Sequence, residues 1–200
     1  ASDVPDTIRH ALLLLIGLAQ ASLIQTSHAQ SPSTPVQDID GNTYPTVRIG
    51  DQVWMAQNLL TTRYANGDAI PTLENPQQWA ASLATGATSI YANDPGNLAL
   101  GLGRLYNGGA VLDPRGLCPT GWAVPTSQQW NVLIERIGGP DNAGAAMKFP
   151  LGWPTDGTAV GASGFTALPA GLRSETGAFE NAGAFTGFWS STPSPESLAL

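Results

Sequence analysis

Residues 116–130 constrain the fold more than any other part of the chain, because they lead from a turn rich in Pro and Gly into the strongest helix signal. Thr126 and Gln129 have the spacing of a capping box, in which the two side chains satisfy amide groups at a helix start. The apolar residues that follow repeat at the spacing of one helical face: Trp130, Leu133, Ile134 and Ile137. Residues 138–140, Gly-Gly-Pro, are expected to end this helix.

Weaker patterns predict the remaining elements. Residues 44–49 and 52–55 are rich in β-forming residues on either side of a turn, which predicts a hairpin. Asn75 has the position of an N-cap for a short helix that turns Trp79 inward, and a second main helix is expected near residues 143–148. Short buried strands are expected at three later places: residues 164–169, 177–179 and 187–192. These signals predict an α+β fold with two main helices, small antiparallel sheets and long loops.

The start of the chain has the pattern of an export signal. Basic residues precede an apolar run over residues 11–24, and small residues follow at a cleavage position after Ala29. The run is short for a membrane span, so we expect no span in the mature chain and a secreted or cell-surface protein. A buried N-terminal helix is the alternative. The expected organisation has three parts: a signal peptide at residues 1–29, a Pro/Ser-rich linker at residues 30–37 and one domain at residues 38–200.

Charge and residue types exclude several functions. The net charge of −7 argues against binding of nucleic acid or an anionic membrane surface, since both need a basic patch. Cleavage after Ala29 would remove both histidines, and Cys118 is the single cysteine. Nucleophilic triads and zinc or copper sites then lack their residues. We therefore expect no enzyme activity, no catalytic residue and no cofactor.

Two kinds of carboxylate site remain open. A polysaccharide hydrolase needs a pair of acids, although no spacing singles out two of the candidates and solvated surface acids are the simpler interpretation: Glu74, Glu135, Asp156, Glu175 and Glu180. Calcium prefers oxygen ligands, and one weak candidate cluster is Asp38, Asp40 and Asn42. A second cluster is Asn93 and Asp94. A turn explains the first cluster better than calcium does.

The tryptophans suggest where a ligand would bind. Four of the six lie in patterned elements and are expected in the core: Trp54, Trp122, Trp130 and Trp189. Trp79 and Trp153 lie nearer to predicted loops and are the candidates for stacking on the face of a sugar ring. Partial burial of these two side chains is the competing interpretation.

Several stretches, in a fixed order, carry a resemblance to a known family: residues 38–44, 47–59, 105–107, 116–126, 164–173 and 188–192. Across them the chain resembles the Fibrobacter succinogenes major paralogous domain, a family of exported bacterial modules. The resemblance implies a secreted or surface module and does not assign a biochemical role. It also implies a fold related to C-type lectin-like and formylglycine-generating-enzyme-like domains, through the Cys-Pro-x-Gly-Trp motif and the late Trp-Ser-Ser-Thr motif.

The resemblance has an implication for the C-terminus. Members of the family usually continue past Trp-Ser-Ser-Thr to an Arg-Cys pair, whereas this sequence ends at Leu200. We therefore expect a truncated domain without its C-terminal strands, in which Cys118 has lost a disulfide partner absent from this chain. Such a bridge would contribute on the order of 4 kcal/mol in the chain-entropy account.

The leading hypothesis is an exported, non-enzymatic binding or surface module whose partner is a glycan or a surface protein. Long loops rich in Gly, Asn and Ser on a fixed scaffold suit ligand binding. The alternatives are a carboxylate-based polysaccharide hydrolase and a purely structural component of the cell envelope.

Overall fold

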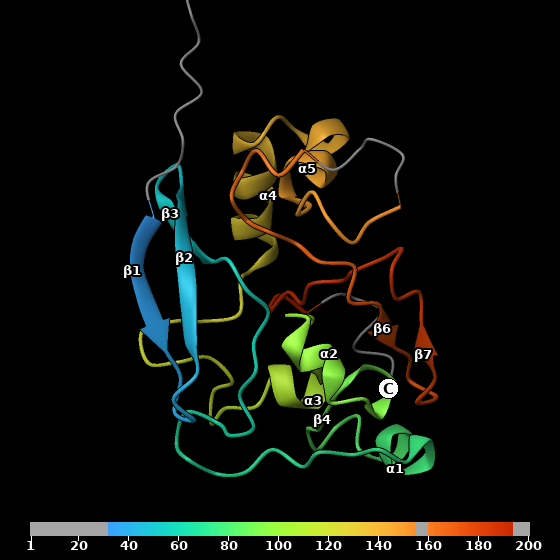
Figure 1. Cartoon of the computed structure of the whole chain (residues 1–200). Coiled ribbons are helices and arrows are strands. Elements are labelled where there is room, and N and C mark those ends of the chain that lie inside the picture. Colours follow the sequence, from blue (N-terminus) through green and yellow to red (C-terminus); the bar gives the residue numbers. More distant parts are fainter. Residues whose placement is uncertain (1–31, 155–159, 194–200) are drawn as a thin grey trace, which may run out of the picture.

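The computed structural model describes residues 32–154 and 160–193 (Figure 1). The predicted signal peptide and Asp156 lie outside the described residues. Within them, five short α-helices accompany three small antiparallel sheets, which confirms the mixed α+β prediction. No helix among the described residues is long and apolar enough to cross a membrane.

The largest sheet has three antiparallel strands in the order β1-β2-β3, namely Pro32–Gln37, Thr43–Ile49 and Gln52–Met55. The pairing of Ile49 with Gln52 closes the β2-β3 hairpin, as the sequence predicted. Strand β2 directs Ile49 and other apolar side chains inward, while alternate positions face solvent. One face of the sheet therefore contributes to the core.

Strand β1 corrects the linker prediction, because residues 32–37 form a strand where the sequence suggested a Pro/Ser linker. Val36 pairs with Tyr44, and the register shifts between Ser33 and Val36. The strand lies at the edge of the sheet, a position where prolines are tolerated. Pairing with β2, rather than local composition, decides the conformation of this segment.

The helices are short, and the two longest are α4 and α5 near the top of Figure 1, in agreement with the predicted two main helices. Their bounds are α1 Pro76–Ala81, α2 Gly96–Ala99, α3 Gly108–Val111, α4 Ser127–Arg136 and α5 Pro140–Met147. A short 3-10 helix covers Tyr91–Asn93.

Helix α4 begins as predicted. The Thr126 hydroxyl accepts from the Gln129 amide at 3.2 Å, and the Gln129 side chain accepts from the Thr126 amide at 2.9 Å. Leu133 is fully buried beneath the helix. Pro140 differs from the prediction, since it opens α5 at the first helical turn, where its missing amide is not needed.

Two further sheets have two strands each. They pair β4 Thr88–Ser89 with β5 Leu105–Tyr106, and β6 Leu172–Arg173 with β7 Phe179–Glu180. Strand β7 lies at the end of the strand predicted for residues 177–179.

The strands predicted at residues 164–169 and 187–192 are wrong. In the first segment, only Ala167 forms a bridge, with Lys148. The Ala167 carbonyl accepts from Phe149 and from the Trp153 indole instead of a strand neighbour. The second segment forms no strand and ends in a bend at residues 191–192. An apolar β-rich run becomes a strand only where a partner strand lies beside it.

The interior consists of two apolar clusters. The first joins the β2-β3 hairpin, α4 and the loop after α5, and its buried members are Val47, Ile49, Trp54, Leu133, Phe165 and Ala167. The second joins β5, α3 and nearby loops, and its buried members are Tyr64, Ile70, Tyr106, Ala110, Val111 and Leu117. A cavity lined by residues of both clusters lies between them.

Candidate functional site

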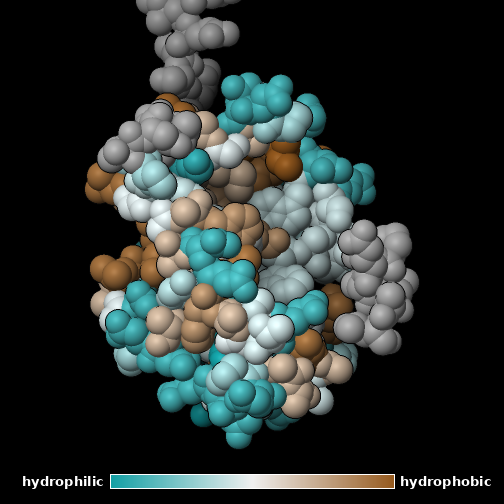
Figure 2. All heavy atoms as spheres, turned by 90° about the vertical axis from the view of Figure 1, so that its right-hand side faces the viewer, coloured by the Kyte–Doolittle hydropathy of each residue, from teal (hydrophilic) through white to brown (hydrophobic). Residues whose placement is uncertain are grey.

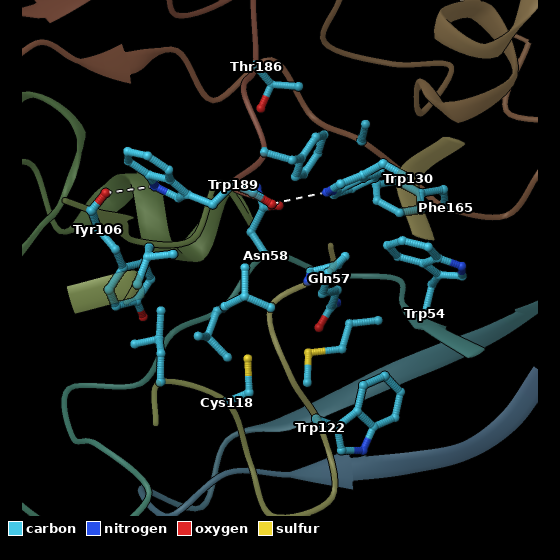
Figure 3. Close-up of a pocket in the computed structure, with 18 of the residues that line it drawn as sticks. Trp54, Gln57, Asn58, Tyr106, Cys118, Trp122, Trp130, Phe165, Thr186 and Trp189 are labelled. Carbon is cyan, nitrogen blue, oxygen red and sulfur yellow. Dashed lines mark hydrogen bonds between the residues drawn. The ribbon is translucent and has the colours of Figure 1, made fainter. Parts of the chain in front are cut away.

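A cavity of about 560 Å³ lies between the two apolar clusters (Figure 3). Figure 3 shows Trp54, Trp130 and Phe165 on one side, and Trp189 with Tyr106 on the other. Small-molecule sites have volumes of roughly 300–1,000 Å³, mostly apolar walls and a few polar groups. The cavity has the size and position of a binding site.

One wall of the cavity is a continuous aromatic surface. The ring centroids of Trp54 and Trp130 lie 4.7 Å apart, and those of Trp130 and Phe188 lie 5.7 Å apart. Phe188 meets Phe165 edge to face at 5.3 Å. Tilted and edge-to-face contacts of this kind stabilise aromatic groups in fixed orientations. The wall therefore presents rigid ring surfaces to whatever enters.

The prediction that Trp189 belongs to the core is wrong, because half of its surface (50%) is exposed. Its indole nitrogen donates to the Tyr106 carbonyl at 2.9 Å, and its own carbonyl accepts from the Trp130 indole at 3.1 Å. Of the other three tryptophans expected in the core, Trp54 is buried, whereas Trp122 and Trp130 are only partly buried. Trp189 thus combines an anchored position with an accessible ring.

The segment that carries Phe188 and Trp189 is fastened to the start of α4. The Ser191 amide donates to the Pro125 carbonyl, and its hydroxyl donates to the Val124 carbonyl, each at 2.9 Å. The amide of Ser127 donates to the Thr192 hydroxyl at 3.0 Å. These bonds hold the aromatic side chains over the cavity without a strand.

Apolar surface also reaches the outside of the molecule. On the face shown in Figure 2, hydrophilic residues lie at the top and at the bottom, and many paler or brown residues lie between them. The exposed large apolar side chains include three from one stretch of chain: Phe185, Phe188 and Trp189.

The polar lining is sparse. The Asn58 side-chain amide donates to the Leu102 carbonyl at 2.9 Å, and Gln57 and Thr186 add further polar groups. Arg104 is the one cationic residue in the lining and Asp51 the one carboxylate. Such a wall can hold an uncharged or singly charged ligand by ring contacts and a few hydrogen bonds.

Cys118 lines the same cavity and is a free thiol in this chain. Burial raises the pKa of the thiol to about 11, so it is protonated at neutral pH. A protonated thiol is a weak nucleophile and a poor metal ligand. The predicted disulfide partner outside this chain stays a prediction.

The carboxylate of Asp38, the first calcium candidate, accepts hydrogen bonds from donors of the protein itself. The buried Asp38 carboxylate accepts from the amides of Asp40 and Asn42, the Asn42 side chain and the Tyr44 hydroxyl. The carboxylate oxygens of Asp38 therefore stabilise the turn between β1 and β2.

The Asp40 carboxylate also has partners within the protein. It accepts from Thr61 and Thr62 and pairs with Arg63 at 3.3 Å. Burial acts to raise the pKa of Asp40, but these bonds and Arg63 hold it below its usual value.

The second candidate cluster also makes hydrogen bonds within the protein. In the second cluster, Asp94 accepts from the Gly96 amide and Asn93 donates to the Glu74 carbonyl. Among the described residues, no three His, Cys, Asp or Glu side chains lie together as a metal site.

The two tryptophans predicted to bind sugar do not line the cavity. Trp79 is only 2% exposed, its indole donates to the Ser174 carbonyl, and the Arg173 guanidinium lies 4.5 Å from its ring centre. Trp79 is therefore a core residue, and that prediction is wrong. Trp153 is partly buried against the first cluster, with the Lys148 amine 4.8 Å from its ring centre.

The acids considered for hydrolysis also lie elsewhere. Four are exposed, and none contributes to the cavity lining: Glu74, Glu135, Glu175 and Glu180. Their positions agree with surface acids.

Sequence reasoning missed Arg104, Phe188 and the exposure of Trp189. Arg104 belongs to no recognisable motif, and it lines the cavity because it immediately precedes β5, a strand of the second cluster. The family stretch at residues 188–192 was the one available signal for the aromatic segment.

Comparison with known proteins gives one match. The model of a family described as the Fibrobacter succinogenes major domain matches residues 47–199. No curated protein and no solved structure matches the chain. The matched range includes the β2-β3 hairpin, both main helices and the aromatic segment over the cavity.

Proposed function

Because the chain belongs to the Fibrobacter succinogenes major domain family, we propose that it is an exported, non-enzymatic binding module with its ligand site in the aromatic cavity. The ligand class that fits the lining is carbohydrate. We further propose that the scaffold is related to C-type lectin-like domains, as the Cys-Pro-x-Gly-Trp motif implies.

The observation that carries the proposal is the accessible indole of Trp189 at a cavity of about 560 Å³. Sugar rings present C–H groups on one face, and tryptophan binds such faces through its large flat ring. Asn58, Gln57 and Thr186 supply the polar groups that hydroxyls need. A wall of this composition supports binding of a sugar ring.

The lining supports binding better than hydrolysis. Glycoside hydrolysis commonly uses two carboxylates about 5–9.5 Å apart on either side of the bond that breaks. Asp51 is the one carboxylate in the described lining, and it lies exposed in the turn between β2 and β3. Neither the hydrolase nor a purely structural role has an observation that favours it.

Export rests on the signal pattern at residues 1–29 and on the family. The protein collected from outside the producing cell should begin at Gln30, which mass spectrometry of the intact chain would show. Retention of residues 1–29 by the mature protein would contradict export by this signal.

Replacing Trp189 by Ala should weaken glycan binding by about 10- to 30-fold, the loss typical of a central aromatic contact. A glycan array on the purified exported chain would identify a bound sugar, and calorimetry would give its affinity. Trp189→Phe should retain part of the affinity because it keeps a ring at the same place.

Trp153→Phe is the matched control for Trp189→Phe, since Trp153 is a tryptophan that does not line the cavity. Its affinity for the same glycan should equal that of the unaltered protein. Binding of no glycan, or equal loss in the Trp189 and Trp153 variants, would remove the support for this site.

A further inference from the structure

Arg104 is a partly buried residue of the cavity lining that forms no ion pair with the described residues. It immediately precedes β5, and its backbone amide donates to the Leu59 carbonyl at 3.0 Å. The Nε and Nη1 atoms of its guanidinium are buried and have no hydrogen-bond partner among the described residues. None of the ion pairs of the described part involves Arg104.

Arg173, an arginine in the protein interior, shows the usual solution. Its guanidinium donates to the carbonyls of Gly177, Leu73 and Glu74 and lies over the rings of Trp79 and Phe179. Buried charged groups normally have hydrogen-bond partners, as Arg173 does, because a buried charge without such partners costs free energy. The contrast indicates that Arg104 is positioned for a partner that the described residues do not supply.

The backbone around Arg104 cannot easily withdraw from the cavity. The Asn58 side chain holds the Leu102 carbonyl at 2.9 Å. Gly103 has a φ of 74°, and a Cβ there would lie 2.4 Å from the Asn58 Cβ. This close approach fixes the chain just ahead of the arginine. The main chain of Arg104 is therefore set in place before any ligand arrives.

We propose that Arg104 pairs with a carboxylate of the ligand, so that the bound sugar is a uronic acid unit. This inference rests on the proposed function and specifies its substrate class. The sugar ring lies against the aromatic wall, and its carboxylate satisfies the guanidinium in an environment with one other charged side chain, Asp51. Charge-assisted bonds between arginine and carboxylate are strong and directional, particularly away from water.

The test compares oligogalacturonate with the same oligomer after methyl esterification, which removes the charge and keeps the rings and linkages. By calorimetry, the unaltered protein should bind the acid form at least about 10-fold more tightly than the ester. Arg104→Gln should bind the two forms equally, and Arg104→Lys should keep part of the preference. Trp189→Ala should weaken both forms by the same factor.

Stability provides an independent readout. Arg104→Met removes a charged group that has no ion-pair partner among the described residues, so the melting temperature of this variant should stay unchanged or rise by a few degrees, about 2–5 °C. A decrease of about 2–5 °C in the melting temperature would show that Arg104 stabilises the fold, and this result would overturn the inference. Uronate at saturating concentration should raise the melting temperature of the unaltered protein more than that of Arg104→Gln.

The outcomes separate this inference from the proposed function. In one outcome, the unaltered protein binds the acid and the ester equally, and Trp189→Ala loses binding of both. This outcome would support the proposed sugar site and overturn the role of Arg104. A preference for the acid that survives in Arg104→Gln would also overturn it. Binding of neither form would contradict this inference directly, while the glycan array would still decide whether the site binds other sugars.

Discussion

Asp38→Ala should lower the free energy of unfolding by about 3–5 kcal/mol, because it removes a buried carboxylate that organises the turn between β1 and β2. The carboxylate accepts two backbone amides and two side-chain donors, the latter from Asn42 and Tyr44. The Tyr44 hydroxyl is fully buried and also accepts from the Leu60 amide at 3.0 Å. Loss of Asp38 therefore leaves four donors of Asp40, Asn42 and Tyr44 without their partner.

Urea denaturation followed by tryptophan fluorescence would measure this effect. Asp51→Ala is the matched control, since Asp51 is exposed in the next turn of the same sheet, and its change should stay within about 0.5 kcal/mol. Asp38→Asn should fall between the two, because an amide keeps one acceptor oxygen in place of two. A change of less than about 1 kcal/mol for Asp38→Ala would show that water replaces the carboxylate at little cost.

Gly109→Ala should lower the free energy of unfolding by about 2–4 kcal/mol, because α3 packs against neighbouring backbone with no room for a methyl group. A Cβ at Gly109 would lie 2.5 Å from the Gly86 amide nitrogen, 2.6 Å from the Leu83 carbonyl oxygen and 2.8 Å from the Ala84 carbonyl carbon. All three are main-chain atoms, so no side chain can turn aside.

The same substitution at Gly144 should have the opposite sign. Gly144 lies within α5, and a Cβ there has nothing within 4 Å. Alanine favours helix over glycine by up to about 1 kcal/mol, so Gly144→Ala should raise stability by roughly 0.5–1 kcal/mol. Thermal and urea unfolding of the two variants would give the comparison. Equal effects at both positions would mean that α3 moves away to accommodate the methyl group.

Local patterns predicted the elements whose stability is mainly local. The capping box at Thr126 and the apolar spacing through Leu133 predicted α4, and both are present in the structure. The Asn75 cap predicted α1, where its side chain accepts from two amides of the first turn. In each case the partners lie within one or two turns of one another, so the spacing of residue types suffices.

Patterns that need a distant partner were predicted less well. Residues 32–37 have the composition of a linker, and only the ladder with β2 makes them a strand. Residues 164–169 and 187–192 have β-forming composition but lack a neighbouring strand. Trp79 follows a predicted cap and is buried by residues about 95 positions later, since its indole donates to Ser174. Whether a single aromatic ring is buried depends on which distant segments of the chain pack against it.

By itself, the sequence determined the family, the mixed α+β class, the hairpin and the two main helices, because these depend on motifs or on neighbours close along the chain. Only the tertiary structure decided where a ligand can bind. The cavity exists because two apolar clusters pack side by side and leave a space between them, which Trp189 borders and Arg104 lines. The exposure of the Trp189 ring, and the lack of a partner for the Arg104 guanidinium among the described residues, depend on contacts between residues far apart in the sequence. Spacing along the chain does not predict such contacts.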